Sequence, residues 1–135
     1  MKKIDIFKKL RSSGLRPTKQ RVEIAKFLFE RDKTFHFTVE SLDKLLAKKT
    51  TSRFALATIY NTVHAFKSAG HLREVDVRGK KTYFDTNITN HHHFYDNETS
   101  ELIDINVNEI VIQKIPKAPN GKKIKNVEVF INLKN

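Results

Sequence analysis

The spacing of apolar residues changes once along this chain of 135 residues, and this change constrains the fold more than any other feature. Up to residue 70, apolar side chains recur every three or four positions, which is the period of an amphipathic helix. Thr18 and Thr38 are suited to N-cap positions, and Ile4, Phe7 and Leu10 are predicted to share one buried helix face. The helices are predicted over residues 4–13, 19–31, 39–48 and 57–68.

Residues 72–85, LREVDVRGKKTYFD, follow the alternating period of β-strands. Two short alternating segments lie on either side of Arg78-Gly79-Lys80, a turn sequence, so they predict a β-hairpin with a basic tip. Helices followed by a basic hairpin are typical of a winged helix-turn-helix.

The rest of the chain predicts a second, smaller module. Residues 86–90 show no period and are interpreted as a hinge. Strands are expected at residues 94–95, 102–105 and 123–133, and a helix at 108–114. The predicted fold class is α+β, with a winged-helix DNA-binding domain over residues 1–85 and a small C-terminal α/β dimerisation domain over 91–135. The second module has little apolar mass and exposed strand edges, so we expect a second copy of the chain to complete it.

The positive charge is confined to the first module. The formal net charge is +11, and residues 1–85 carry 20 Lys and Arg against 9 Asp and Glu. Residues 86–135 carry 6 of each kind. A field of one sign over one module indicates a polyanionic partner there, although solubility alone is the simpler reading. An RNA-binding basic protein explains the charge but not its confinement.

The sequence has no apolar run of membrane-spanning length and no signal peptide at its start, so we expect a cytoplasmic protein without a membrane partner. It contains no cysteine, which excludes disulfides, catalytic thiols and cysteine-type structural zinc sites.

The segment ATIYNTVHAFKSAG, residues 57–70, has the pattern of a recognition helix. Ile59, Val63 and Phe66 are predicted to face the core, which leaves a polar and basic stripe outward. Such a stripe fits the major groove of duplex DNA, whereas an ordinary solvated face is the bland alternative. The DNA-binding residues predicted on this helix are Thr58, Tyr60, Asn61, His64 and Lys67, and those predicted on the hairpin, for phosphate contacts, are Arg78, Lys80 and Lys81.

Three consecutive histidines, His91, His92 and His93, suggest a metal or heme site. In an extended chain His91 and His93 point to one face and His92 to the other, and two imidazoles on one face can converge on an ion. A polar edge strand is the alternative. Imidazole and carboxylate ligands suit iron, manganese or zinc. A zinc hydrolase is a third alternative, but the sequence has no HExxH-like pair and no nucleophile motif.

The segments GLRPTKQR, ATIYNTVHAFKSAGHLREV, KTYFD and HHHF followed by ELIDI resemble the ferric uptake regulator family. Within it, YNT, the histidine run that ends in an aromatic residue and VEVFINL resemble the iron response regulator branch. The resemblance implies a winged helix, a hinge and a C-terminal dimerisation module. It also implies a dimeric transcription factor that represses iron and heme genes by binding AT-rich inverted repeats in double-stranded DNA.

Matched residue by residue, the resemblance implies that Tyr60 contacts bases and that Arg16 is the basic residue of the minor groove. It implies an interdomain site for a divalent metal (Fe, Mn or Zn) or heme. The candidate ligands are His36, Asp85, His91, His92, His93 and Asp104. The chain departs from the family pattern by lacking paired CxxC motifs and the cysteine heme motif, and by carrying Asn126 and Val127 where many members place a histidine ligand.

Overall fold

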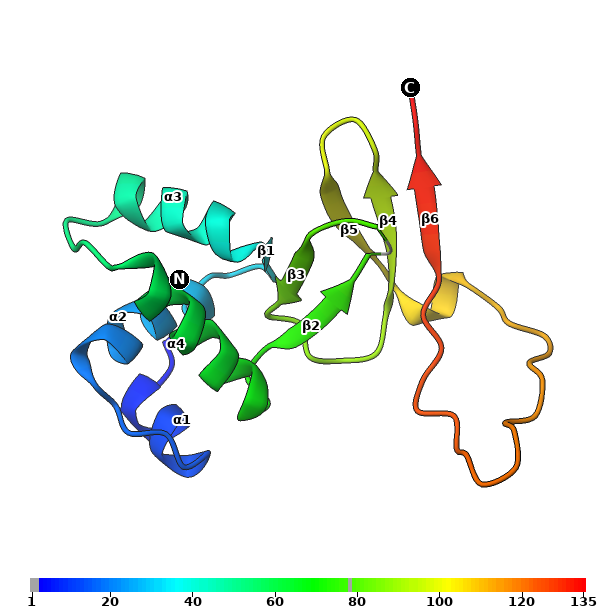
Figure 1. The fold of residues 1–135 in the computed structure, drawn as a ribbon, viewed down its shortest axis with the longest axis horizontal. Helices are drawn as coiled ribbons and strands as arrows, with labels where there is room; N and C mark the ends of the chain where they lie inside the picture. Colours follow the sequence, from blue (N-terminus) through cyan, green and yellow to red (C-terminus); the bar gives the residue numbers. More distant parts are fainter. Residues whose placement is uncertain (1–2, 78) are drawn as a thin grey trace. The chain divides into compact units, whose positions relative to one another are not determined.

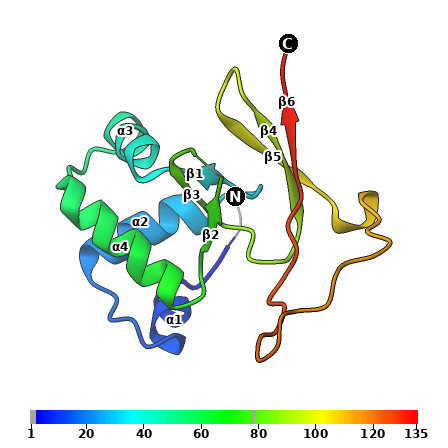
Figure 2. The ribbon, with the colours of Figure 1, turned by 45° about the vertical axis from the view of Figure 1, so that its right-hand side comes forward.

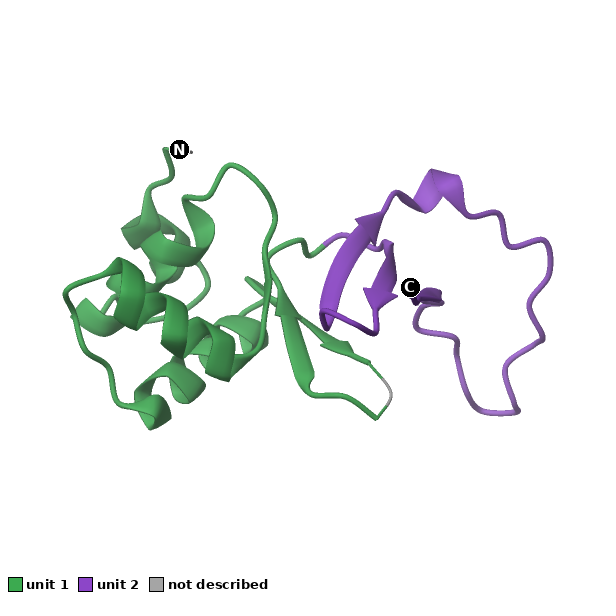
Figure 3. Ribbon diagram, turned by 90° about the horizontal axis from the view of Figure 1, so that it is seen from above, with its two compact units in different colours: residues 1–88 green, residues 89–135 purple. Residues whose placement is uncertain are grey.

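The computed structural model describes residues 3–77 and 79–135. Contacts divide the chain into two compact units, residues 1–88 and residues 89–135, drawn in green and purple in Figure 3. Each unit is described separately. No helix in the described part of the chain has the length and apolar character needed to cross a bilayer.

Unit 1 begins with helices whose ends are set by local hydrogen bonds. The Thr18 hydroxyl accepts a hydrogen bond from the Arg21 amide at 3.3 Å, and the Thr38 hydroxyl accepts one from the Ser41 amide at 3.0 Å. The Ser41 hydroxyl in turn accepts from the Thr38 amide at 2.9 Å, so this helix start carries a reciprocal capping box. Both predicted N-caps are confirmed. The helices are α1 (Ile6–Ser12), α2 (Lys19–Phe29), α3 (Val39–Lys49) and α4 (Leu56–Ser68).

The core of unit 1 lies between these helices, and α4 contacts both α2 and α3. The predicted inward face of α4 is confirmed, because Ile59, Val63 and Phe66 are each at most 1% exposed. The predicted face of α1 is wrong at Phe7, which is 43% exposed. Since α1 starts only after the Asp5 cap, Ile6 and Leu10 form the buried i, i+4 pair and Phe7 lies a step round the helix.

A small antiparallel sheet completes unit 1, in the strand order β1-β3-β2 (Figure 2). Its strands are β1 (His36–Phe37), β2 (Arg73–Asp76) and β3 (Thr82–Asp85). The β2–β3 hairpin confirms the predicted wing. Strand β1 pairs with β3 so that His36 lies opposite Asp85, and Phe37 lies opposite Phe84.

Unit 2 is built on a second sheet of three strands, in the order β5-β4-β6 (Figure 1). Strand β4 (His92–Asp96) pairs antiparallel with β5 (Glu101–Ile105) and parallel with β6 (Phe130–Leu133). The β4–β5 turn is closed by Asp96, whose carboxylate accepts a hydrogen bond from the Glu98 amide at 2.9 Å. The buried hydrophobic residues of this unit are Tyr95, Leu102 and Ile105.

Two predictions for unit 2 are corrected. A single 3₁₀ turn, Val107–Glu109, replaces the helix predicted over 108–114, and the segment that follows runs without helix or strand (orange in Figure 1). Ile110, Val111 and Ile112 are β-branched and have low helix propensity. Val111 is 88% exposed, so a short helix here would gain little stability from packing within this chain. The last strand covers only Phe130–Leu133 of the predicted 123–133.

His71 ties the end of α4 to the end of α1. Its Nε2 lies 2.7 Å from Ser13 Oγ, and the Ser13 hydroxyl lies 2.8 Å from the Leu10 carbonyl oxygen, to which it donates. The imidazole therefore donates to Ser13. Burial lowers the pKa of His71 below its ordinary value of 6.5, and the charge of Lys9 lowers it further.

This contact predicts a loss of stability in mild acid. Because the pKa of His71 is lower in the folded state, the unfolded chain binds more protons just below pH 6.5, and the free energy of unfolding falls as the pH falls through that region. Gln retains an N–H donor but does not titrate, so His71→Gln should flatten the fall. Urea unfolding between about pH 7.5 and pH 5 measures it. Parallel curves for wild type and variant would contradict the prediction.

Candidate metal centre and nucleic-acid interface

The histidine run of unit 2 directs two imidazoles at one carboxylate. His91 and His93 are two residues apart and share a face, and Asp104 lies opposite His93 in the β4–β5 register. The Nε2 atoms of His91 and His93 lie 3.1 and 3.4 Å from the same oxygen, Asp104 Oδ1. Both imidazoles are buried, at 5% and 0% exposure, and their ring centroids are 4.4 Å apart.

A backbone contact decides which nitrogen of His91 is available. Its Nδ1 lies 2.7 Å from the Thr89 carbonyl oxygen, which can only accept, so Nδ1 carries a proton. In a neutral ring, Nε2 then presents a lone pair toward Asp104. A lone pair and a carboxylate oxygen 3.1 Å apart are attracted only through a shared cation, which is either a proton or a metal ion. A backbone acceptor of this kind is the usual means of orienting a metal-binding histidine.

The three side chains therefore fit a divalent metal. One ligand atom from each of His91, His93 and Asp104 lies within 4.8 Å of the other two. Nitrogen and oxygen donors suit first-row ions such as iron, manganese and zinc. We call His91, His93 and Asp104 the triad.

His92 points away from the triad, as the alternation of a strand predicts. Its Nδ1 accepts a hydrogen bond from the Val129 amide at 2.9 Å, and the amide of His93 donates to the Val129 carbonyl at 3.1 Å. His92 is therefore not part of the triad, and its imidazole anchors the segment that leads into β6. Its predicted metal role stays a prediction. Phe130 stacks on His93 at 5.7 Å, which fixes the same junction.

Unit 1 contains a second imidazole–carboxylate contact. His36 Nε2 lies 3.1 Å from Asp85 Oδ2, across the β1–β3 pairing. Asp85 is fully buried, and its Oδ1 accepts a hydrogen bond from the Asn87 amide at 2.8 Å. A buried carboxylate needs such partners, because desolvation otherwise disfavours its charge. We call His36 and Asp85 the pair.

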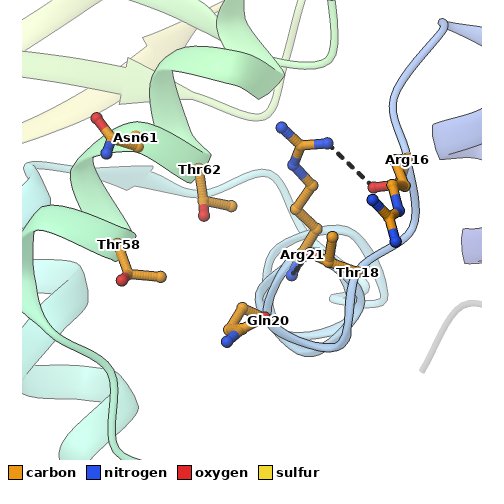
Figure 4. Close-up of a pocket in the computed structure, with 7 residues that line it drawn as sticks. All are labelled: Arg16, Thr18, Gln20, Arg21, Thr58, Asn61 and Thr62. Carbon is orange, nitrogen blue, oxygen red and sulfur yellow. Dashed lines mark hydrogen bonds between the residues drawn. The ribbon is translucent and has the colours of Figure 1, made fainter.

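A polar groove runs between the start of α2 and the start of α4 (Figure 4). Arg21 spans part of it, since its Nη1 donates to the Arg16 carbonyl at 3.1 Å. The sequence predicts Arg16, Thr58 and Asn61 as DNA-binding residues, but it does not predict Gln20 and Arg21. The Thr18 cap was the signal that could have found them, because it places both residues in the first turn of α2. The groove is lined by Arg16, Thr18, Gln20, Arg21, Thr58, Asn61 and Thr62.

The other predicted DNA-binding residues differ in exposure. Tyr60 is 52% exposed, and Lys67, Lys80 and Lys81 are exposed as well. His64 is only partly exposed, because its ring lies between Tyr60 and Phe84. Its predicted contact with DNA stays a prediction. Arg78 lies outside the described residues.

Comparison with known proteins agrees with this arrangement. Residues 12–133 match the ferric uptake regulator family. The chain belongs to the ferric uptake regulator family. It is 30% identical over 95 residues to the peroxide-responsive repressor PerR of Staphylococcus epidermidis, which covers 70% of this chain and 61% of that protein. It is 30% identical over 100 residues to PerR of Staphylococcus saprophyticus, covering 74% and 66%. The matched segment thus spans less than two thirds of these relatives. Members of the family are transcription regulators and not enzymes.

Solved structures show the same fold. The ferric uptake regulator of Pseudomonas aeruginosa with manganese superposes with a TM-score of 0.72 at 22% identity, covering 98% of both chains. That of Vibrio cholerae superposes with a TM-score of 0.73 at 19% identity, covering 97% of this chain and all of the other. The fold is therefore that of a ferric uptake regulator: a winged helix followed by a small three-stranded module. The resemblance to the iron response regulator branch stays a prediction.

The contact of His92 with Val129 generates a specific prediction. His92→Ala removes the acceptor of the Val129 amide, so hydrogen exchange at that amide should speed up about twofold to tenfold, the equivalent of one net hydrogen bond. His92→Asn is the matched control, since its Oδ1 occupies the place of the imidazole Nδ1 and can still accept. NMR measures the exchange rate of the Val129 amide. Equal rates in His92→Ala and His92→Asn would contradict the assignment of His92 Nδ1 as the acceptor.

Proposed function

We propose that this protein is a metal-responsive transcription regulator that binds duplex DNA as a homodimer and controls iron homeostasis. The observation that carries the proposal is the triad, in which two buried imidazoles face one carboxylate oxygen in a chain whose other unit is a basic winged helix. A site for a cation in one unit and a surface for a polyanion in the other are the two parts that such a regulator needs.

The triad and the pair are proposed to bind the same ion. The pair alone offers two ligands and the triad three, and together they supply the nitrogen and oxygen donors that iron, manganese and zinc accept. One ligand set lies before residues 86–90 and the other after them. Binding by both would hold the winged helix at one angle, so the metal would favour one member of a set of conformations.

The effector is proposed to be a divalent ion. Solved relatives are described with manganese, with iron and with zinc, which supports this choice. None of those descriptions concerns heme, and the sequence lacks the cysteine of a thiolate heme ligand. The donors of the triad and the pair are imidazole and carboxylate, which do not select among the three ions.

The DNA is proposed to be an AT-rich inverted repeat, read by one α4 helix in each half-site. Tyr60 and Asn61 would meet base edges in the major groove, Arg16 would enter the adjacent minor groove, and Lys80 and Lys81 on the wing would contact phosphates. The groove of Figure 4 supports this assignment, because it places Arg16 and Arg21 beside the polar residues at the start of α4. A regulator of this kind acts in the cytoplasm.

Unit 2 is proposed to hold the dimer together. It has no net charge, so two copies do not repel each other, and β5 and β6 are the outer strands of its sheet. Many of its aliphatic residues remain exposed, which supports burial against a second copy. These residues are Ile103, Val107, Val111, Ile112, Ile115, Ile124, Val127 and Ile131. Sedimentation that finds a monomer at micromolar concentration, with DNA binding intact, would count against the dimer.

Removing the triad should abolish the response to metal. The double variant His91→Ala with His93→Ala should remain folded, since no structural zinc depends on these residues, but its DNA affinity should no longer change with Mn²⁺. Titration of DNA with and without Mn²⁺ measures this, with His92→Asn as a control that keeps the wild-type response. If the double variant still responds like wild type, the regulatory site lies elsewhere.

Shared binding of the ion has its own test. His36→Ala removes a ligand from unit 1 only, yet it should weaken Mn²⁺ binding measured by calorimetry and should abolish any metal-dependent protection of the amides of residues 86–90 from hydrogen exchange. Unchanged Mn²⁺ affinity in this variant would show that the triad binds the ion without the pair.

Measurements of DNA affinity should distinguish residues that contact bases from residues that contact phosphates. A dimer with roughly 6–10 phosphate contacts should lose about 10³–10⁵ in affinity between roughly 50 and 200 mM salt. Lys80→Ala should weaken all duplexes alike, whereas Tyr60→Ala should reduce the preference for the specific duplex by about 1–3 kcal/mol per half-site. The specific duplex can be selected from a randomised pool. Equal losses for Tyr60→Ala on selected and random DNA, or preferential binding to RNA, would contradict the assignment.

A further inference from the structure

The two faces of the β1–β3 pairing carry different chemistry. Successive residues of a strand point to opposite faces, so the pairing that joins His36 to Asp85 places Phe37 and Phe84 on the other face. The phenylalanine rings stack there at a centroid distance of 5.8 Å, and each is 2% exposed. A shift of either strand at the pair therefore has to shift a ring in the core.

Those rings lead to the recognition helix. Phe84 meets the ring of His64 edge-on, at 5.5 Å and an interplanar angle of 83°. His64 in turn lies 4.2 Å from the ring of Tyr60, one helical turn earlier on α4. Edge-to-face and offset contacts of this kind restrict ring orientation, since the edges and faces of aromatic rings carry opposite partial charges. A continuous series of ring contacts thus connects a β3 residue beside Asp85 with the exposed Tyr60.

We propose that His64 is a positioning residue, through which the β1–β3 strands set the orientation of the Tyr60 ring. The inference rests on the proposed function, because it takes Tyr60 as a base-reading residue and His36 and Asp85 as metal ligands. It assigns His64 a contact with neither DNA nor metal. Binding of an ion by the pair then changes the orientation of the Tyr60 ring within unit 1, in addition to any change at residues 86–90.

The mechanical properties of the neighbouring elements support this route. Strand β1 has only two residues and lies at the outer position of the sheet, so few backbone hydrogen bonds resist its displacement. Helix α4 is fixed by the buried Ile59, Val63 and Phe66, so its backbone is the rigid part. Tyr60 is 52% exposed, and the contact with His64 is one of the restraints on its ring. A displacement that starts at β1 therefore ends in a side-chain rotation rather than in a shift of the helix.

The competing explanation is that His64 contacts DNA itself, which a double-mutant cycle separates from a positioning role. The probe is the duplex selected from a randomised pool, compared with a shuffled duplex of the same composition, without metal. If His64 acts through Tyr60, His64→Ala should lower the preference for the selected duplex by about threefold to tenfold, the equivalent of one aromatic pair. The same change should have no effect in a Tyr60→Ala background. An equal loss in both backgrounds would overturn the proposal.

Ring geometry gives a rescue variant. His64→Phe keeps a ring between Tyr60 and Phe84 but removes both nitrogens, so it should retain the preference if positioning matters. It should lose the preference if an imidazole nitrogen contacts a base or phosphate, and that result would overturn the proposal. His71→Ala is the matched control, because it also removes a partly buried histidine of unit 1, but one whose ring contacts among the described residues are with Phe29 and Phe66.

A second readout needs no DNA. Zn²⁺ is diamagnetic, so the ring resonances of Tyr60 can be followed by NMR during a Zn²⁺ titration and assigned by their loss in Tyr60→Phe. They should move in wild type, His64→Phe and His71→Ala. In His64→Ala they should stay in place while calorimetry shows the same Zn²⁺ affinity. Tyr60 resonances that move equally in His64→Ala, or that fail to move in wild type, would overturn the coupling.

The outcomes distinguish this proposal from the proposed function. A wild-type chain that binds no divalent metal would overturn the proposed function, and the metal-driven part of the coupling with it. The metal-free cycle would still decide whether His64 positions Tyr60. A wild-type chain whose DNA affinity responds to metal, with additive effects of His64→Ala and Tyr60→Ala, would overturn the coupling alone.

Discussion

The antiparallel register of β1 against β3 is the constraint on which the chemistry of unit 1 depends. It places a histidine opposite an aspartate on one face of the sheet and a phenylalanine opposite a phenylalanine on the other. If β3 slipped by one residue, its side chains would exchange faces. Asp85 would then point toward the core, and Phe84 would point to the face that carries His36. Burial of Phe37 and Phe84 makes that slip costly, because two aromatic side chains would lose their apolar surroundings. The hydrophobic core thus holds the polar pair in place.

Unit 2 positions its histidines with a smaller hydrophobic core. Its buried hydrophobic residues are Tyr95, Leu102 and Ile105, and three histidines of the unit are buried as well. The three perform two tasks. His91 and His93 share one carboxylate oxygen, while His92 accepts a backbone hydrogen bond that attaches the segment before β6. A metal bound by the triad would add stability to this small core, since the free energy of binding is also free energy of folding.

Much of the first unit could be predicted from the sequence because its signals are local. The Thr18 and Thr38 caps, the inward face of α4 and the β2–β3 hairpin each depend on residues within a few positions of one another. Prediction failed where a local pattern lacked a partner. Phe7 follows a helical period but lies outside the face set by the Asp5 cap. The apolar side chains of residues 108–114 have little to pack against within one chain, where Val111 is 88% exposed. The contact of Phe84 with His64 is not predicted either, because helical spacing does not reveal which strand residue packs against the helix.

The sequence by itself determined the charge asymmetry, the absence of thiolate chemistry and the opposite faces of His92 and its two neighbours, because composition and the period of a strand do not depend on the rest of the fold. It also determined the supply of imidazole and carboxylate ligands. Only the tertiary structure decided that Asp104 lies opposite His93, that Thr89 selects the ring nitrogen which His91 presents, and that His92 bonds to Val129. These are contacts between strands and loops, and they follow from pairing register and packing, which no local pattern encodes.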